Sequence, residues 1–151
     1  MEIPEFLLRN NERLLEFQPF TNNIDFASLA TGANIDGSFT SQNDSDFIIL
    51  KTTYYCHTVQ TTAPTNATRI IPWATVQLND TGSGRNLMSS ATMVSAVFGT
   101  GELPFIWQAP YLVKGNSTIT ATLANITTGA GEAYIIRLQF HGVKIFYGKN
   151  P

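Results

Sequence analysis

The sequence predicts an all-β protein, an antiparallel jelly-roll-like β-sandwich of about eight strands. Two runs near the C-terminus, Thr118–Leu123 and Tyr134–Phe146, alternate apolar and polar residues with the period of two that a half-buried strand requires. Glycine and asparagine clusters separate the apolar runs, and no convincing long helical pattern follows residue 20. In the second run the apolar face consists of Tyr134, Ile136, Leu138 and Phe140.

Length and composition are those of one self-sufficient domain. A chain of 151 residues buries enough surface to form a core without a disulfide or a metal. The single cysteine, Cys56, lies in an apolar run and is predicted to be a small buried hydrophobe. The charged fraction of 13% is about half the usual ~25%. Low charge with many Thr, Ser, Asn and Gly residues is typical of secreted or virion β proteins that act as surfaces.

The expected strands follow from the alternating runs and the turns between them. The run from Asp46 to Cys56 is apolar on both faces in its first half, as in a central strand. Asp80–Arg85 is the strongest turn in the chain, and Pro110 places its strand at an edge or corner. The strands are expected near residues 24–29, 34–40, 46–56, 73–79, 86–88 with 93–98, 104–113, 117–124 and 133–147.

Residues 1–19 differ from the sandwich domain expected over residues 20–151. Leucines repeat at a spacing of seven, Glu5 and Arg9 are four apart, and Pro19 stops a helix that Pro4 could start. Two readings stay open: a partly helical segment packed on its own domain, or an arm that contacts another subunit or a capsid. The apolar residues available for that contact are Phe6, Leu7, Leu8, Leu14, Leu15 and Phe17.

The sequence gives little support for catalysis. His57 and His141 could join a carboxylate in a metal site or a triad, but a satisfied or solvent-facing histidine is the simpler interpretation. No G-x-S-x-G motif is present, and Asp80–Arg85 lacks the Lys-Ser/Thr pair of a phosphate-binding loop. We therefore expect no enzyme activity, no metal and no cofactor.

Aromatic side chains are the alternative means of recognition. Trp73 and Trp107 are the candidates for exposed aromatics that would stack on sugars or fill an interface. As strand residues, most of the other aromatics are expected in the core.

Charge and hydropathy restrict the partners. The net charge is −2 and no basic stripe is present, so we expect no nucleic-acid binding. No apolar run approaches the ~20 residues of a membrane span, so no membrane partner is expected. The chain begins Met-Glu-Ile-Pro-Glu, which is unlike a signal peptide and predicts synthesis in a host cytoplasm.

Five short motifs over residues 80–147 resemble those of a known family. They are S-G-R-x-L at Ser83–Leu87, F-G-x-G-x-x-P-F at Phe98–Phe105, P-x-L-x-x-G at Pro110–Gly115, S-T-I-T at Ser117–Thr120 and H-G-x-K-x-F at His141–Phe146. Their order is similar to that in jelly-roll cement or decoration proteins of tailed-bacteriophage heads.

The resemblance implies a virion structural protein on the outside of the capsid. Its expected partner is the major capsid protein, and its expected self-association is a trimer, with a dimer as runner-up. The resemblance implies no catalytic residues. The alternative is a carbohydrate- or receptor-binding β-sandwich module of a phage fibre or spike, because the jelly roll by itself does not determine function.

Overall fold

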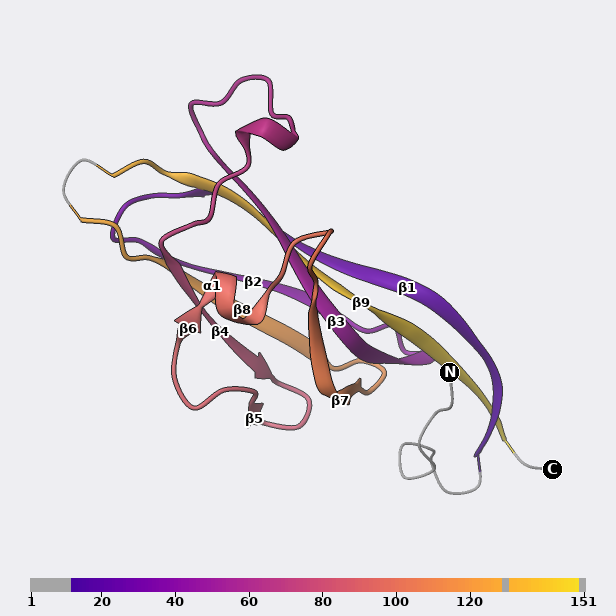
Figure 1. Cartoon of the computed structure of the whole chain (residues 1–151). Coiled ribbons are helices and arrows are strands. Elements are labelled where there is room, and N and C mark those ends of the chain that lie inside the picture. Colours follow the sequence, from indigo (N-terminus) through magenta and orange to yellow (C-terminus); the bar gives the residue numbers. More distant parts are fainter. Residues whose placement is uncertain (1–11, 129–130, 150–151) are drawn as a thin grey trace.

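The computed structural model describes residues 12–128 and 131–149, which form two antiparallel sheets packed face to face (Figure 1). The prediction of an all-β sandwich is therefore confirmed. Two short helical turns, η2 (Asn66–Thr68) and α1 (Val94–Val97), lie between strands. The strands are β1 (Glu12–Leu29), β2 (Asn34–Thr40), β3 (Ser45–Thr58), β4 (Ala74–Asp80), β5 (Arg85–Asn86), β6 (Thr92–Met93), β7 (Phe105–Val113), β8 (Thr118–Asn125) and β9 (Tyr134–Lys149).

The strand order is that of a jelly roll. One sheet has the order β1-β9-β3-β7, and the other has β2-β8-β4-β5, with β6 also paired to β4. The pairs β1·β9, β2·β8 and β3·β7 are nested like the arms of one long hairpin. Rolling that hairpin up adds the pairs β9·β3 and β8·β4. Since β5 and β6 both pair with β4, they fill one strand position, and the sandwich has eight positions.

The core lies between the sheets and is built on β9. Tyr134, Ile136, Leu138 and Phe140 are all buried and point inward, as the alternation predicted. They meet the inward residues of β8 and β4, including Ile119, Leu123 and Val76. Aromatic rings fill the middle, where Phe140 packs edge-to-face on Phe98 with ring centroids 5.5 Å apart. Each of these side chains contributes about 1.5–3 kcal/mol when fully buried.

The N-terminal segment differs from one of the two structures expected for it. Residues 12–19 are strand, so the helical alternative is wrong over that part, and β1 runs through the expected boundary at residue 19 without a break. Residues 1–11 lie outside the described residues. The helical spacings are local, whereas pairing with β9 from Glu12 to Leu29 supplies backbone hydrogen bonds along the whole segment. Pro19 is tolerated because β1 is an edge strand.

A second correction concerns residues 93–98, which were expected as strand. Residues 94–97 instead form α1, and the amide of Phe98 donates to the carbonyl of Val94 at 2.9 Å. Val94 and Phe98 are both fully buried. Residues four apart lie on one face in a helix and also in a strand. The hydrophobic pattern of Val94 and Phe98 therefore could not distinguish a helical turn from a strand.

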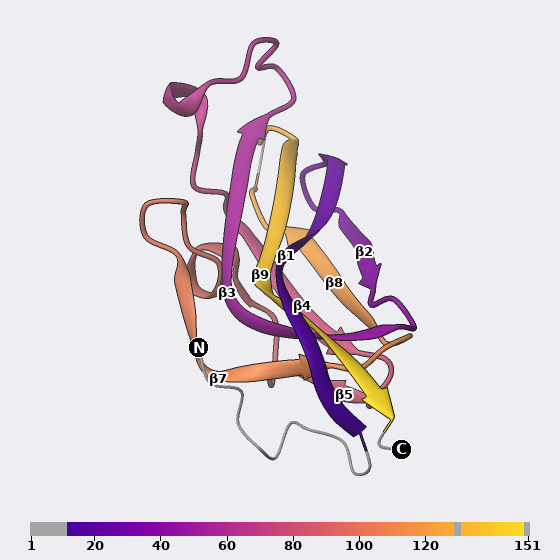
Figure 2. The ribbon, with the colours of Figure 1, turned by 90° about the vertical axis from the view of Figure 1, so that its right-hand side faces the viewer.

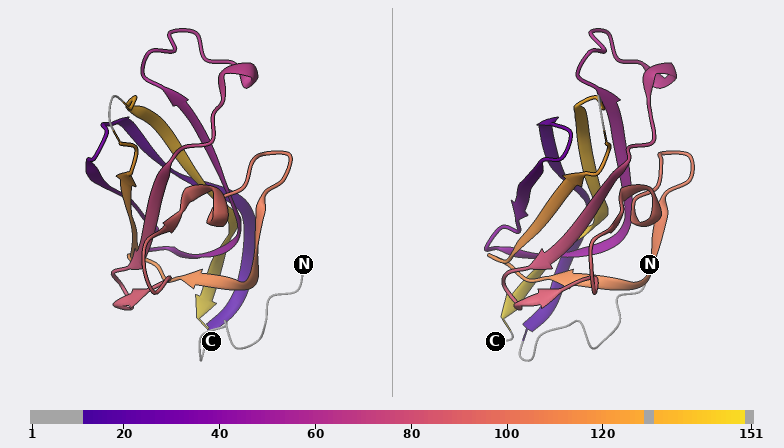
Figure 3. Two further views of the ribbon diagram at one scale, coloured as in Figure 1. Left: turned by 60° about the vertical axis from the view of Figure 1, so that its left-hand side comes forward. Right: turned by 90° about the vertical axis from the view of Figure 1, so that its left-hand side faces the viewer.

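The loops divide between the two ends of the sandwich (Figures 2 and 3). At one end, which we call the loop end, lie residues 30–33, 59–73, 99–104, 126–128 and 131–133. Backbone hydrogen bonds join these loops: Val59 donates to Ala133, Gly32 to Asn125, and Ile126 to Trp73. The opposite end holds the turns at 41–44, 81–84 and 114–117. Within the described part of the chain, no helix has the length and hydropathy to cross a membrane.

Gly142 is predicted to be indispensable for the sheet. It lies opposite Ile49, beside the irregularity in β3, and a Cβ there would overlap the carbonyl oxygen of Ile48. We expect Gly142→Ala to lower the free energy of unfolding by about 3 kcal/mol, because main chain must move in a packed sheet. Guanidinium denaturation measures this. Gly101→Ala is the matched control, since its Cβ would meet nothing within 4 Å; equal stability of the two variants would contradict the assignment.

Candidate functional site

The two histidines do not form a common site. His57 lies opposite Ile135 and His141 opposite Lys51, so they are separated by six positions along β9, or ~20 Å. Both ring nitrogens of His141 contact threonine hydroxyls, Thr21 at 3.2 Å and Thr53 at 2.8 Å. Burial, and then the charge of Lys51, lower the pKa of His141. Within residues 12–128 and 131–149, no three His, Cys, Asp or Glu side chains gather as a metal site would require.

Cys56 is a core residue. Its side chain is fully buried, and burial raises the pKa of its thiol to about 12. The sulfur contacts the carbonyl oxygen of His57 at 3.9 Å. A thiol that stays protonated and inaccessible is a poor nucleophile, so the adjacent Cys56-His57 pair has no catalytic geometry.

The two tryptophans do not form a joint platform. Trp73 precedes β4 in one sheet and is 59% exposed, whereas Trp107 lies in β7 of the other sheet and is only partly exposed. The indole nitrogen of Trp107 donates to the hydroxyl of Thr52 at 3.2 Å, and its ring packs against Tyr111. Trp107 therefore supports the edge of the core, and only Trp73 is offered to a partner.

For most of the predicted N-terminal contact residues, the structure does not describe the side chain. Phe6, Leu7 and Leu8 lie outside the described residues, and the side chains of Leu14 and Leu15 are not described either. Phe17 lies in β1 and is 44% exposed. The arm as a contact with another chain stays a prediction.

Exposed apolar side chains gather at the loop end. Leu103 is 80% exposed and Ile71 is 75% exposed, and Val59, Trp73 and Ile126 are also at this end. Phe105 and Ile106, which follow the 99–104 loop, are exposed as well. Among the described residues, Phe17 is the one large hydrophobic side chain of this exposure that lies elsewhere. Several exposed apolar side chains at one end of a domain identify that end as a candidate interaction surface.

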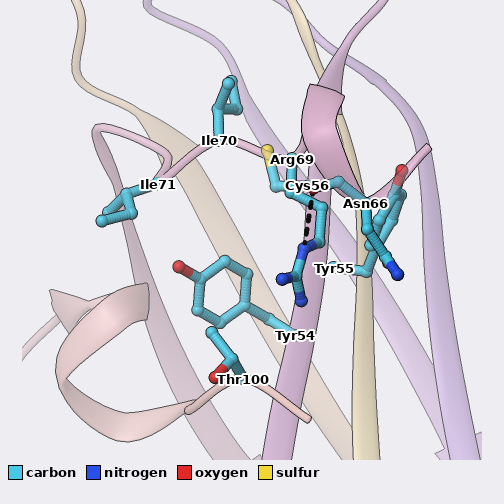
Figure 4. A pocket seen from close by; sticks show the side chains of 8 residues that line it. All are labelled: Tyr54, Tyr55, Cys56, Asn66, Arg69, Ile70, Ile71 and Thr100. Atoms are coloured by element: carbon cyan, nitrogen blue, oxygen red, sulfur yellow. Dashed lines mark hydrogen bonds between the residues drawn. The ribbon is translucent and has the colours of Figure 1, made fainter. Parts of the chain in front are cut away.

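A pocket of about 210 Å³ opens within the loop end (Figure 4). Tyr54 and Cys56 of β3 and Ile70 and Ile71 of the 59–73 loop provide its apolar walls, and Thr100 closes one side. Burial is the main cause that raises the pKa of Tyr54, so its phenol stays neutral in this wall. The pocket is of a size and polarity that would accept one apolar side chain of a partner.

An ion pair fixes the rim of this pocket. The guanidinium of Arg69 donates to the carboxylate of Glu102 at 3.4 and 3.5 Å, which ties the 59–73 loop to the 99–104 loop. Arg69 also donates through Nε to the carbonyl oxygen of Asn66 at 3.3 Å (Figure 4). A backbone hydrogen bond at Glu102 itself, and then Arg69, lower the pKa of the Glu102 carboxyl. The rim is polar and charge-compensated around an apolar centre, as in many protein interfaces.

Sequence reasoning missed Ile71 and Leu103. Their signal is an aliphatic residue directly before proline in a loop, at Ile71-Pro72 and Leu103-Pro104. That pattern predicts an extended backbone but not which side the side chain faces. The comparisons with known proteins add no assignment: no protein-family model, curated protein or solved structure matches the chain.

Cys56 provides a test of the pocket wall. At pH 8 a thiol with a pKa of about 12 carries roughly one thiolate in ten thousand molecules, so we expect almost no reaction with a disulfide reagent in the folded protein. In guanidinium the single thiol should react stoichiometrically within minutes. Absorbance of the released thiolate measures both rates. Comparable rates in the folded and unfolded protein would show that Cys56 is open to solvent.

Proposed function

We propose that this chain is a virion structural protein that binds the outside of the major capsid protein lattice of a tailed phage and decorates or cements the head. The observation that carries the proposal is the gathering of exposed apolar side chains at one end of a jelly-roll sandwich. The motif resemblance between residues 80 and 147 supports the same assignment.

The rigidity of the loop end suits attachment to a lattice. The side chain of Asn125 donates to the carbonyl oxygens of Leu29 and Glu132 at 3.0 and 3.2 Å, which ties the ends of β8 and β1 to the loop before β9. Arg69 and Glu102 join two loops. Loops that are already ordered lose less conformational entropy when a partner binds, so a small apolar contact retains more of its free energy.

A small contact surface requires multivalency to be effective. Stable pairs of proteins bury about 1,600 Å² in total, which is more than a few loop side chains provide. Self-association into a closed trimer would present three loop ends to a lattice with matching symmetry. The second and third contacts would then form at high effective concentration. The trimer is part of the proposal.

Association with particles is the first expectation to test. We expect the chain to remain with capsid shells through density-gradient purification and to occur at a fixed ratio to the major capsid protein. Quantitative mass spectrometry of the gradient fractions measures that ratio. Recovery in the fibre or spike fraction, or as free protein, would contradict the assignment and favour the receptor-binding alternative.

The loop end is expected to make the contact. The double variant Ile71→Ser/Leu103→Ser should rebind to stripped shells at least about 150-fold more weakly, because each buried aliphatic side chain contributes about 1.5–3 kcal/mol. Co-sedimentation at graded concentrations measures this, with thermal unfolding as the check on folding.

Phe17→Ser tests the N-terminal segment, because Phe17 is exposed and apolar, lies outside the loop end and belongs to the predicted N-terminal contact residues. If the loop end alone makes the contact, its affinity should equal that of the unchanged protein. Deletion of residues 1–11 tests the N-terminal arm separately. A defect in that deletion or in Phe17→Ser, with normal binding by the double variant, would move the contact to the N-terminal segment.

A further inference from the structure

In the four-stranded sheet β9 lies between β1 and β3 (Figure 2), and three of its outward residues, Arg137, Gln139 and His141, form a polar row. Alternate residues of β9 point away from the core, and the register aligns them with outward residues of β1 and β3. Arg137 lies between Asp25 and Tyr55, and Gln139 between Asn23 and Thr53. The next outward residue, His141, lies between Thr21 and Lys51.

Two hollows lie along this row. The first, of about 490 Å³, is lined by residues that include Asp25, Tyr55, His57, Arg137 and Gln139. The second, of about 410 Å³, is lined by residues that include Phe20, Thr21, Lys51 and His141.

The hydroxyl of Thr53 connects the two hollows. It lies 3.0 Å from the amide oxygen of Gln139 and 2.8 Å from Nε2 of His141. The lining residues of the two neighbouring hollows extend along β9 from Ile135 to Gly142, a span of ~20 Å. We call the two hollows together the β9 groove.

The polar groups of the first hollow can both donate and accept hydrogen bonds. The guanidinium of Arg137 donates twice to the carboxylate of Asp25, at 2.5 and 3.3 Å, and both side chains remain about half exposed. His57 is only 8% exposed, and its Nδ1 atom is buried without a hydrogen-bond partner. A buried polar atom without a partner is costly, so the wall of this hollow has an unmet capacity for a hydrogen bond.

We propose that the β9 groove binds an oligosaccharide. Sugar hydroxyls both donate and accept, which matches a paired carboxylate and guanidinium, the amide of Gln139 and an imidazole. The Tyr55 ring, tilted against His57 at a centroid distance of 5.4 Å, adds an aromatic surface of the kind on which the C–H face of a sugar ring packs. A groove of this length accommodates several sugar residues.

Other classes of ligand fit less well. A nucleic acid requires a track of uncompensated cations, but Asp25 neutralises Arg137, and Lys51 is the other cation lining the groove. Apolar residues such as Ile135 and Leu50 also line the hollows, but none of them is among the exposed large hydrophobic side chains that mark the loop end. The groove shares Tyr55 with the loop-end pocket, but the Arg69–Glu102 ion pair and the exposed apolar side chains of the loop end lie outside it.

Binding of the purified chain to a printed array of di- to hexasaccharides, built from hexoses, hexosamines and uronic acids, tests the proposal. The soluble form of the best oligosaccharide is then titrated calorimetrically. We expect Asp25→Ala and Arg137→Ala each to weaken its binding about tenfold, as loss of a charge-assisted hydrogen bond implies. Tyr55→Phe should retain binding because the ring remains, whereas Tyr55→Leu should weaken it.

Arg69→Ala provides the matched control, because it breaks an exposed Arg–carboxylate pair of the same kind at the loop end. It should bind the oligosaccharide as tightly as the unchanged protein. Thermal unfolding of each variant verifies the fold. Absence of binding to every saccharide on the array would overturn the proposal, as would equal losses in Arg69→Ala and Arg137→Ala.

Discussion

The fold depends on one strand that pairs on both sides. β9 is hydrogen-bonded to β1 along nearly its whole length and to β3 from Phe146 to Tyr134. From Tyr134 to His141, alternate residues of β9 face the core and the outer side of the sheet, whereas Val143, Lys144 and Ile145 are all buried. Its even-numbered residues from Tyr134 to Phe140 build the core, and its odd-numbered residues from Ile135 to His141 line the β9 groove.

The edges of the four-stranded sheet show how the protein avoids uncontrolled pairing. β1 carries Pro19, and β7 carries Pro110 within a stretch that leaves the register of β3 between Tyr111 and Ile106. Beyond β7, loop residues cover the edge of β3: Gly99 exchanges backbone hydrogen bonds with Thr52 and Tyr54, and Ile70 donates to Cys56. Proline, irregular register and loop cover are the known means of protecting an exposed edge. Because the edges of the four-stranded sheet are protected against pairing with another strand, the proposed attachment through side chains of the loop end is consistent with this structure.

The sequence predicted those features of the fold whose signals lie within the segment itself. The runs that became β8 and β9 were predicted within one or two residues, because alternation and flanking turns are contained in the segment itself. The strand over residues 12–19 was missed, because its partner β9 lies more than a hundred residues away and helical spacings were the only local signal. The exposure of Ile71 and Leu103 depends on where two loops fold, and the pairing of Asp25 with Arg137 depends on register across 112 residues. Neither can be read from a window of the chain.

The two proposed surfaces share a wall but use different side chains. Tyr55 lines both the loop-end pocket and the first hollow of the β9 groove, and its hydroxyl approaches the carbonyl oxygen of Thr65 at 3.5 Å. A saccharide in the groove would lie along β9 on the outer face of the four-stranded sheet, whereas the proposed lattice contact is made by loop-end side chains such as Ile71 and Leu103. One sandwich could therefore bind a particle through its loop end and a glycan through its outer sheet face. The alternation of side chains along β9 places apolar residues in the core and polar residues in the groove.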